Sequence, residues 1–490
     1  MLTMKPYVFW FVTGSQHLYG DDTLKQVEEN SKDLVHQLNE SGHLPFPIKF
    51  KQVLTNSSDI HEVCLQANES ADCAGIITWM HTFSPAKMWI AGLKALQKPL
   101  LHLHTQYNKE VPWETIDMDF MNLNQSAHGD REYGFIGTRL HKARKVIVGY
   151  WGSETIQKRV ASWMTVAAGF NESHSIRVAR FGDNMRNVAV TDGDKIEAQI
   201  KFGWTVDYYG IGDLVEVINT ITEEAVNDLM EEYRTLYDFP ENEEQLAAIK
   251  EQARIELGLQ EFLEAGNYHA FTTNFEDLHG MEQLPGLAAQ RLMAKGYGFA
   301  GEGDWRTAAL VRLMKVMAGN EKTSFMEDYT YHLEEGNELI LGSHMLEICP
   351  SISATKPAVQ VHPLSMGDKK DPARLVFDGV GGKAVNVSVI ELGGRFRMVI
   401  NKVDAVQPEV DTPRLPVAKV LWKPLPSLSE ATEAWIYAGG AHHTALSFSL
   451  TAEQLEDYAE MIGIECVTID EETQLKTFRK ELAFNQLIWK

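Results

Sequence analysis

Short apolar runs alternate with amphipathic helical stretches along the chain as far as Thr323. The first series predicts strands at 7–13, 74–80, 99–104 and 145–150, with helices at 21–38 and from 154 onward. The second series predicts strands at 176–182, 204–210 and 268–275, with helical tracts at 222–264 and 284–295. This strand–helix rhythm is typical of parallel sheets with both faces covered. We therefore expect two Rossmann-like, doubly wound α/β domains.

Beyond Thr323 the pattern changes to strands separated by Gly and Pro turns. The predicted strands lie at 359–364, 373–379, 384–392, 395–403 and 417–425. A strand at 434–438 running into Gly439 and Gly440 is also expected, and a helix, a strand and a helix follow at 451–463, 464–469 and 474–486. The fold class is thus α/β, with two Rossmann-like domains (1–175 and 176–325) followed by a β-rich, antiparallel, barrel-like C-terminal domain (326–490).

Composition narrows the classes of function. A length of 490 residues fits about three domains. The net charge of −23 argues against a nucleic-acid or anionic-membrane surface, because both need a basic patch. The four cysteines have no C-x-x-C spacing, and no apolar run has the length of a signal-peptide core or a membrane span. These features predict a cytoplasmic protein that binds neither nucleic acid nor membrane.

Residues 325–345 read as a β-hairpin with a carboxylate out of place. Alternate residues from Phe325 are apolar except for Glu327. An even turn centred between Glu335 and Gly336 would place His344 directly across the ladder, with Cβ atoms ~5 Å apart. The two side chains could then share a metal ion or form a buried ion pair, whereas a bulge or an odd loop would separate them.

The segment 296–320 contains a second odd feature, the letters G-x-G-x-x-G. A dinucleotide fingerprint needs a strand before it, and 284–295 reads as helix. The alternative interpretation is a glycine-rich loop that presents Glu302 and ends where Asp304 caps a helix starting at Trp305. Glu302 alone could equally be a solvated loop residue.

Two further segments offer polar side chains. His442 and His443 follow a Gly-Gly pair, and adjacent residues of an extended chain point opposite ways, so one of them is expected to enter a site. One of these histidines, together with Glu302, Glu327 and His344, would form a set of two carboxylates and two imidazoles suited to Mn²⁺, Fe²⁺, Co²⁺ or Zn²⁺. The loop 14–20, after the first strand, offers Gln16, His17 and Tyr19 either to a hydroxylated ligand or as a hydrogen-bonded structural loop.

Several of these segments, in this order, resemble the L-arabinose isomerases, which are metal-dependent aldose–ketose isomerases. The similarity runs from end to end. Its longest blocks are FVTGSQHLYG at the start, FTTNFEDLHG at 271–280, AGEGDWRTAAL at 300–310, the block at 324–352 and AGGAHHTALS at 438–447. The resemblance implies interconversion of L-arabinose and L-ribulose in L-arabinose catabolism, and activity on D-galactose and D-tagatose.

The resemblance also implies roles for particular residues. It implies one Mn²⁺ per subunit, with Co²⁺ or Mg²⁺ as substitutes, held by Glu302, Glu327, His344 and His443. It implies sugar contacts from Gln16, Leu18, Phe83, His128, Met185 and Phe275. A homohexamer built from two trimers, with active sites between subunits, is expected as well.

The chemistry that the resemblance implies moves a proton between C2 and C1 of the sugar. A divalent ion on the C1 and C2 oxygens would act as a Lewis acid, and Glu302 and Glu327 would share the acid and base roles in a cis-enediol path. A hydride shift would use the same residues. Two other classes also fit part of the pattern: a glycosidase with paired carboxylates, and a sugar-binding protein built from two α/β domains.

Overall fold

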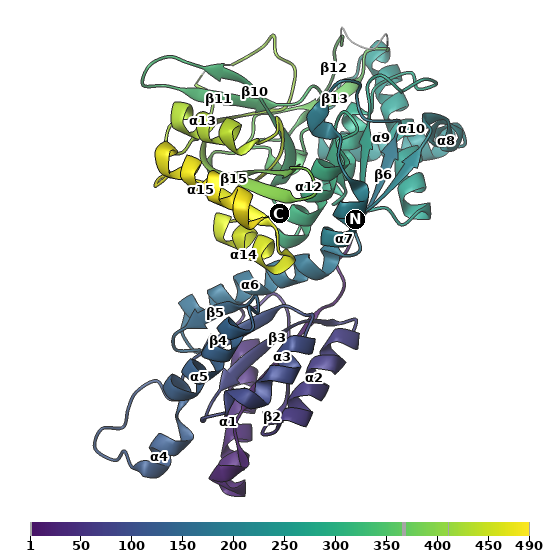
Figure 1. Cartoon of the computed structure of the whole chain (residues 1–490). Coiled ribbons are helices and arrows are strands. Elements are labelled where there is room, and N and C mark those ends of the chain that lie inside the picture. Colours follow the sequence, from purple (N-terminus) through teal and green to yellow (C-terminus); the bar gives the residue numbers. More distant parts are fainter. Residues whose placement is uncertain (1, 365–368, 410, 490) are drawn as a thin grey trace. The chain divides into compact units, whose positions relative to one another are not determined.

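The computed structural model describes residues 2–364, 369–409 and 411–489. The chain divides into two compact units, which we call the N-terminal unit (residues 4–171) and the C-terminal unit (residues 172–490 with 1–3). The expected central α/β region and the expected β-rich region both lie within the C-terminal unit (Figure 1). No helix in the described ranges is both long and apolar enough to cross a membrane.

The N-terminal unit is built on a parallel five-stranded sheet in the order β2-β1-β3-β4-β5. Its central strand, β3, is buried along its whole length, which explains the unbroken apolar run in the sequence. The strands are β1 (Val8–Gly14), β2 (Ile48–Leu54), β3 (Cys73–Met80), β4 (Leu100–His104) and β5 (Lys145–Val148). The helices are α1 (Asp21–Glu40), α2 (Ser57–Glu69), α3 (Ile90–Ala95), α4 (Met118–Leu123), α5 (Ser126–Arg139) and α6 (Glu154–Ser173), with 3-10 turns η1 (His17–Tyr19) and η2 (Ala86–Trp89).

The C-terminal unit begins with a parallel four-stranded sheet in the order β7-β6-β8-β9. The strands are β6 (Arg177–Phe181), β7 (Thr205–Tyr209), β8 (Ala270–Thr273) and β9 (Gly298–Ala300). The helices are α7 (Lys195–Phe202), α8 (Ile211–Ile218), α9 (Glu223–Leu236), α10 (Glu243–Ala265), α11 (Gly286–Ala294) and α12 (Trp305–Met317), with the 3-10 turn η3 (Ala189–Thr191). The two parallel sheets confirm the predicted doubly wound architecture.

The rest of the C-terminal unit is an antiparallel barrel. Its strands follow the order β14-β17-β10-β11-β16-β15, and the pairing of β15 with β14 closes the ring, so the predicted barrel-like domain is confirmed. The barrel strands are β10 (Thr323–His332), β11 (Leu339–Ser343), β14 (Gly382–Glu391), β15 (Phe396–Val406), β16 (Lys419–Pro424) and β17 (His443–Ser447). Outside it lie the parallel strand β18 (Glu465–Ile469), the ribbon β12 (Ala358–Val361) with β13 (Ala373–Val376), the turn η4 (Pro350–Ile352), and the helices α13 (Leu428–Ala438), α14 (Ala452–Ile462) and α15 (Leu475–Ile488).

One helix joins the central sheet to the barrel. Every residue of α12 is buried, and the helix packs on β8 and β9 on one side and on β10 and β17 on the other. A helix that is buried all round shows no amphipathic stripe. The position of α12 matters for function because the loop that precedes it carries Glu302.

The strand expected at 434–438 is wrong, because these residues form the end of helix α13. Ser427 caps the helix by accepting a hydrogen bond from the Glu430 N–H, and the buried residues Ala431, Ala434 and Ala438 recur at helical spacing. The aromatic residues of the segment had favoured a strand. Gly439, with φ of 81°, ends the helix in the left-handed conformation.

Candidate active site

The loop between β9 and α12 places Glu302 at the junction of the central sheet and the barrel. Glu302 has a φ of 59°, a conformation that is strained for a residue with a side chain. Gly303 follows with φ of 78°, and a Cβ there would lie 2.7 Å from the Asp183 backbone oxygen. Asp304 then caps α12, accepting hydrogen bonds from both the N–H and the hydroxyl of Thr307. The predicted cap is therefore confirmed, and the loop holds Glu302 in a fixed conformation.

The same segment excludes the dinucleotide interpretation of the G-x-G-x-x-G letters. Helix α11 precedes them, and the short strand β9 begins at Gly298, inside the motif rather than before it. Gly298 is needed for packing, since a Cβ there would lie 2.0 Å from the Ala308 backbone oxygen. The part predicted as a continuous loop is thus a strand up to Ala300 and a loop only from Gly301.

The hairpin of β10 and β11 has the predicted register near its turn, but the register differs from the prediction beyond Thr330. The pairs Tyr331–Ile340 and His332–Leu339 match a turn centred between Glu335 and Gly336. A bulge between Asp328 and Thr330 then shifts the ladder by one residue. The predicted Glu327–His344 pair is therefore wrong.

Glu327 has one neighbour on each of the two strands that flank β10. Glu327 is opposite Ser343 on β11 and opposite His443 on β17, so the glutamate and this histidine share a face. His344 follows the end of β11. The extra residue in β10 places Ser343 opposite Glu327 instead of His344, because one inserted residue reverses which face of the strand each side chain occupies.

Two buried histidines each contact a carboxylate through one ring nitrogen. His344 Nδ1 lies 2.5 Å from Glu347 Oε2, and His443 Nδ1 lies 3.1 Å from Asp304 Oδ2. The two rings are 5.7 Å apart between centroids. Such carboxylates fix the tautomer and orientation of an imidazole that ligates a metal. Asp304 and Glu347 are not predicted in this role from the sequence, although the spacing of Glu347 three residues after His344 is a usable signal.

The second ring nitrogen of His443 faces Glu302, and His344 offers a ligand atom to the same place. Ligand atoms of Glu302, His344 and His443 all lie within 4.8 Å of one another. His443 Nε2 is buried, has no hydrogen-bond partner among the described residues, and lies 3.8 Å from Glu302 Oε2. A buried nitrogen without a partner is costly, and a metal ion would satisfy it. Two imidazoles and a carboxylate fit a divalent transition ion, so these residues form a candidate metal site.

The charges of the cluster shift the ionisation of its members. The neighbouring His442, then His443 and His344, lower the pKa of the Glu302 carboxyl. Burial alone would lower the pKa of His344, but the ion pair with Glu347 outweighs it and the pKa is raised. Burial opposes the ionisation of Asp304 too, yet the contact with His443 leaves its pKa lowered. The site therefore favours the ionised form of the Glu302 and Asp304 carboxyl groups beside the imidazoles.

His442 also lies close to this cluster, contrary to the expectation that only one of the adjacent histidines enters a site. Its Nε2 is 3.6 Å from Glu302 Oε2, and 37% of its side chain is exposed, against 0% for His443. The strand β17 begins at His443, so the rule of alternating side chains does not apply to His442. The buried member of the pair is His443.

The six predicted sugar contacts fall into two groups. In the C-terminal unit, Phe275 stacks with its ring centroid 6.1 Å from that of His344, and the Met185 N–H donates to the Glu302 carbonyl at 3.0 Å. Both therefore border the candidate metal site. The other four, Gln16, Leu18, Phe83 and His128, lie in the N-terminal unit.

The group in the N-terminal unit lies where the strand order of its sheet reverses. Gln16 and Leu18 follow β1, and Phe83 follows the adjacent strand β3. The two loops are tied together by the hydroxyls of Ser15 and Thr82, 2.7 Å apart. Such a switch point is where open α/β sheets bind ligands. His128, on α5, completes the group with its ring centroid 4.5 Å from that of Phe83.

Comparison with known proteins agrees with this geometry. Residues 3–175, 177–320 and 322–465 match the models of the L-arabinose isomerase N-terminal, central and C-terminal domains. The chain is 64% identical to an L-arabinose isomerase of Geobacillus stearothermophilus, with 100% of both chains covered. It is 61% identical to one of Clostridium beijerinckii, again over 100% of both, and 60% identical to one of Bacillus subtilis strain 168, over 100% of this chain and 99% of that one.

The fold and the site define an aldose–ketose isomerase of mixed α/β and barrel architecture. More particularly, the chain belongs to the L-arabinose isomerase family. This membership excludes the two other classes considered from the sequence, a glycosidase and a sugar-binding protein.

Proposed function

We propose that this isomerase interconverts L-arabinose and L-ribulose through a cis-enediol, with Mn²⁺ held by Glu302, Glu327, His344 and His443. The observation that carries the proposal is the buried Nε2 of His443, which has no hydrogen-bond partner among the described residues and faces Glu302. Glu327 lies directly opposite His443 on the neighbouring strand. A bound divalent ion would supply Lewis acidity to the sugar oxygens at C1 and C2. Co²⁺ and Mg²⁺ are possible substitutes.

The two glutamates would move the proton. One carboxylate removes the proton from C2 and the same or the other carboxyl returns it to C1, while the hydroxyl protons redistribute between the two oxygens. Glu302 has a lowered pKa, so its carboxyl stays ionised, and its loop holds it in one conformation. Glu327 is half-buried on the face shared with His443 and supplies the second carboxylate.

The remaining polar and aromatic groups would position the sugar. Phe275 beside His344 provides an apolar wall, and Met185 lies next to Glu302. We propose that Gln16, Leu18, Phe83 and His128 contact the sugar in the assembled protein, as part of a hexamer of two trimers with active sites between subunits. The high exposure of the Leu18 side chain, 83%, suits a residue that acts only once another chain covers it. Analytical ultracentrifugation would test the hexamer.

The test of the metal mechanism uses metal-stripped protein with L-arabinose. We expect ketose formation only after Mn²⁺ is added, and a loss of about 10²–10⁴-fold in kcat for Glu327→Gln. Glu335→Gln, at the exposed tip of the same hairpin, is the matched control and should keep full activity. Full activity without metal, or an unimpaired Glu327→Gln protein, would contradict the proposal.

Isotope transfer separates the enediol path from a hydride shift. With deuterium at C2 of the substrate, exchange with water should leave the product partly unlabelled at C1, because a carboxyl proton exchanges with solvent. Complete retention would favour the hydride shift. The same assay with D-galactose tests the proposed conversion to D-tagatose, since the two aldoses differ only by the terminal hydroxymethyl group.

A further inference from the structure

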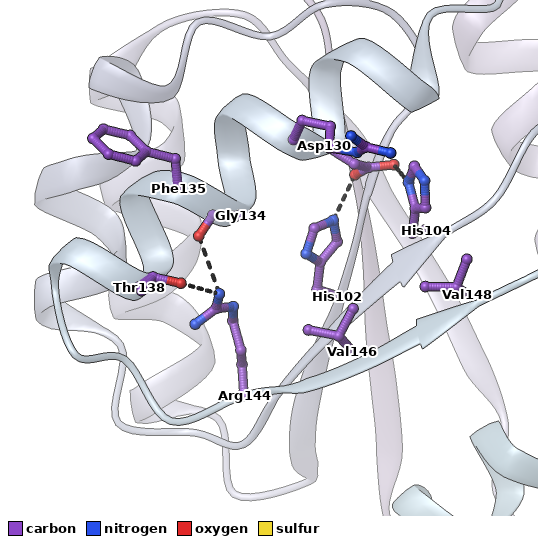
Figure 2. A pocket seen from close by; sticks show the side chains of 10 residues that line it. His102, His104, Asp130, Gly134, Phe135, Thr138, Arg144, Val146 and Val148 are labelled. Atoms are coloured by element: carbon purple, nitrogen blue, oxygen red, sulfur yellow. Dashed lines mark hydrogen bonds and ion pairs between the residues drawn. The ribbon is translucent and has the colours of Figure 1, made fainter.

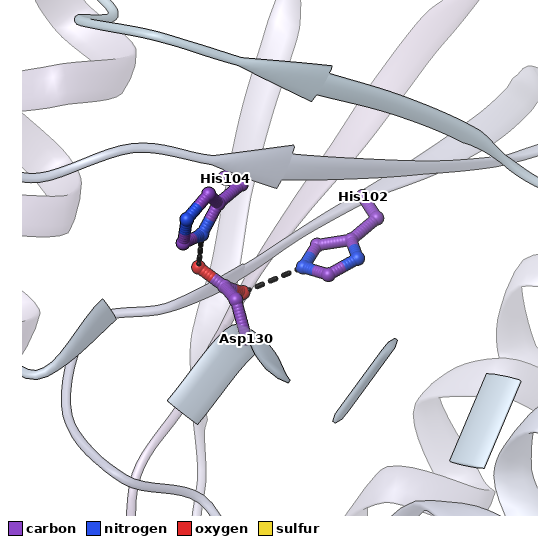
Figure 3. A group of neighbouring side chains, drawn as sticks. All are labelled: His102, His104 and Asp130. Atoms are coloured by element: carbon purple, nitrogen blue, oxygen red, sulfur yellow. Dashed lines mark hydrogen bonds and ion pairs between the residues drawn. The ribbon is translucent and has the colours of Figure 1, made fainter. Parts of the chain in front are cut away.

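A second group of imidazoles and a carboxylate lies in the N-terminal unit. His102 and His104 are two residues apart on β4, so their side chains point to the same face of the strand. Helix α5 crosses that face and brings Asp130 between them (Figure 3). The letters H-L-H at 102–104 are a sequence signal for this pair, but Asp130 is distant in the chain and does not follow from it.

The three side chains converge tightly. Asp130 Oδ1 lies 2.7 Å from His102 Nε2, and Asp130 Oδ2 lies 2.7 Å from His104 Nδ1. One ligand atom from each residue falls within 4.8 Å of the others. Ligands at ~2.1 Å around a tetrahedral ion lie about 3.4 Å apart, so each imidazole nitrogen would have to move about 0.7 Å away from the Asp130 oxygen that it contacts.

The surroundings leave room for a further ligand. His102 and Asp130 are almost fully buried, whereas His104 is 22% exposed and opens the group toward a cavity of about 450 Å³ (Figure 2). Arg144, on the same cavity, donates to the Gly134 carbonyl and the Thr138 hydroxyl and does not pair with Asp130. Water or a small anion could therefore enter as the remaining ligand.

Binding of an ion would change the tautomer of His102. When its Nε2–H donates to Asp130, the other nitrogen, Nδ1, is buried without a hydrogen-bond partner in the described part of the chain. The hydrogen bond to Asp130 therefore keeps the proton on Nε2 as long as no ion is bound. An ion between Nε2 and the carboxylate would need the proton on Nδ1, so that the Nε2 lone pair becomes its ligand.

We propose that His102, His104 and Asp130 form a second divalent-metal site, suited to Zn²⁺ or Co²⁺. Two imidazole nitrogens and one carboxylate oxygen are the donor set of such borderline ions, and Mg²⁺ or Ca²⁺ would prefer more oxygen. The bound ion ties strand β4 to helix α5 and stabilises the N-terminal unit by binding only the folded state. Asp130 is two helix positions from His128, which places the two side chains on different sides of α5.

Metal stoichiometry tests the proposal with the full chain. After chelation, the protein is dialysed against Co²⁺ and bound metal is measured by mass spectrometry. We expect His104→Asn to bind one Co²⁺ fewer per chain than wild type, and His36→Asn, an exposed histidine on α1, to bind as many as wild type. His443→Gln should also lose one ion, and the double variant His104→Asn/His443→Gln should lose both.

The difference between wild type and His104→Asn is the decisive quantity, because it does not depend on what the Glu302 site binds. Asp130→Asn, which keeps the side-chain shape, should weaken Co²⁺ binding at this site by at least about 100-fold. Added Zn²⁺ should raise the Tm of His443→Gln but not of His104→Asn/His443→Gln. Equal stoichiometry in wild type and a folded His104→Asn protein would overturn the proposal and leave a hydrogen-bonded His–Asp–His group.

Discussion

The histidine pairs His344/His443 and His102/His104 both contact carboxylates, but the two pairs differ in how many carboxylates they contact. In the C-terminal unit, His344 and His443 each have a carboxylate of their own, Glu347 and Asp304, on Nδ1. In the N-terminal unit, His102 and His104 share Asp130 (Figure 3).

Each separate carboxylate contacts only the Nδ1 of its own histidine, and the second nitrogen of His443 lies 3.8 Å from Glu302 Oε2. The shared carboxylate must itself be the third ligand. The comparison indicates a pre-oriented site in one unit and a site that must open slightly in the other.

The largest expected effect concerns the choice between the two adjacent histidines near Glu302. Loss of a buried ligand nitrogen in His443→Gln should weaken Mn²⁺ binding by at least about 100-fold. His442→Gln removes a ring that is 37% exposed and should change the affinity by less than about tenfold. Electron paramagnetic resonance of free Mn²⁺ measures both dissociation constants. Equal losses in the two variants would contradict the assignment of His443 as the ligand.

A smaller effect is expected when the ring is kept but its orienting carboxylate is removed. Glu347 accepts from His344 Nδ1 and from the Leu346 N–H, so Glu347→Gln loosens a ring that stays in place. Outer carboxylates of this kind are worth about 10–100-fold in metal affinity. We expect kcat at saturating Mn²⁺ to recover most of its normal value. A variant that stays inactive at any Mn²⁺ concentration would assign Glu347 a direct part in the chemistry.

An added methyl group beside His344 should reduce activity less than the loss of the Glu347 carboxylate. A Cβ at Gly301 would lie 2.9 Å from Cε1 and 3.1 Å from Nε2 of His344, so Gly301→Ala must push the ring by a few tenths of an ångström. We expect about a tenfold loss in kcat/KM with L-arabinose, since larger misplacements near 1 Å cost about 10²-fold.

The matched control for crowding is Gly336→Ala at the hairpin tip. Gly336 has φ of 82° and no atom within 4 Å of an added Cβ. Alanine there should reduce stability by about 1 kcal/mol through backbone strain and leave the kinetics unchanged. Equal kinetic losses in both variants would show that the effect of Gly301→Ala is not local to His344.

The sequence predicts the part of this comparison that depends on local patterns. The parallel sheets, the barrel strands, the Asp304 cap and the hairpin tip all follow from short-range periodicity and turn chemistry. Glu302 stands out because glycines surround it. The resemblance of the blocks at 300–310 and 324–352 supplies the rest of the proposed ligand set.

What the sequence does not predict depends on single residues and on distant contacts. The bulge after Asp328 changes the partner of Glu327, and nothing in the local letters marks the extra residue. The segment 434–438 carries strand-favouring aromatics, but its capped, alanine-lined face makes it the end of α13. Asp130 reaches His102 only through the packing of α5 on β4, which no spacing within the chain encodes.

The smallest expected effect is on the stability of the N-terminal cluster in the absence of metal. Asp130 is buried and accepts from both histidines and, at 3.3 Å, from the Met80 N–H. Asp130→Asn keeps the volume but replaces one acceptor by a donor, which should cost about 1.5 kcal/mol in the free energy of unfolding.

Hydrogen exchange of amides in β4 and α5 measures this local loss. The surface pair of Glu28 and Lys32 provides the control, because Glu28→Gln removes an exposed contact worth less than about 0.5 kcal/mol. Unchanged exchange in Asp130→Asn would mean that the shared carboxylate does not stabilise the metal-free unit. The contrast between the two histidine pairs would then have to rest on metal affinity alone.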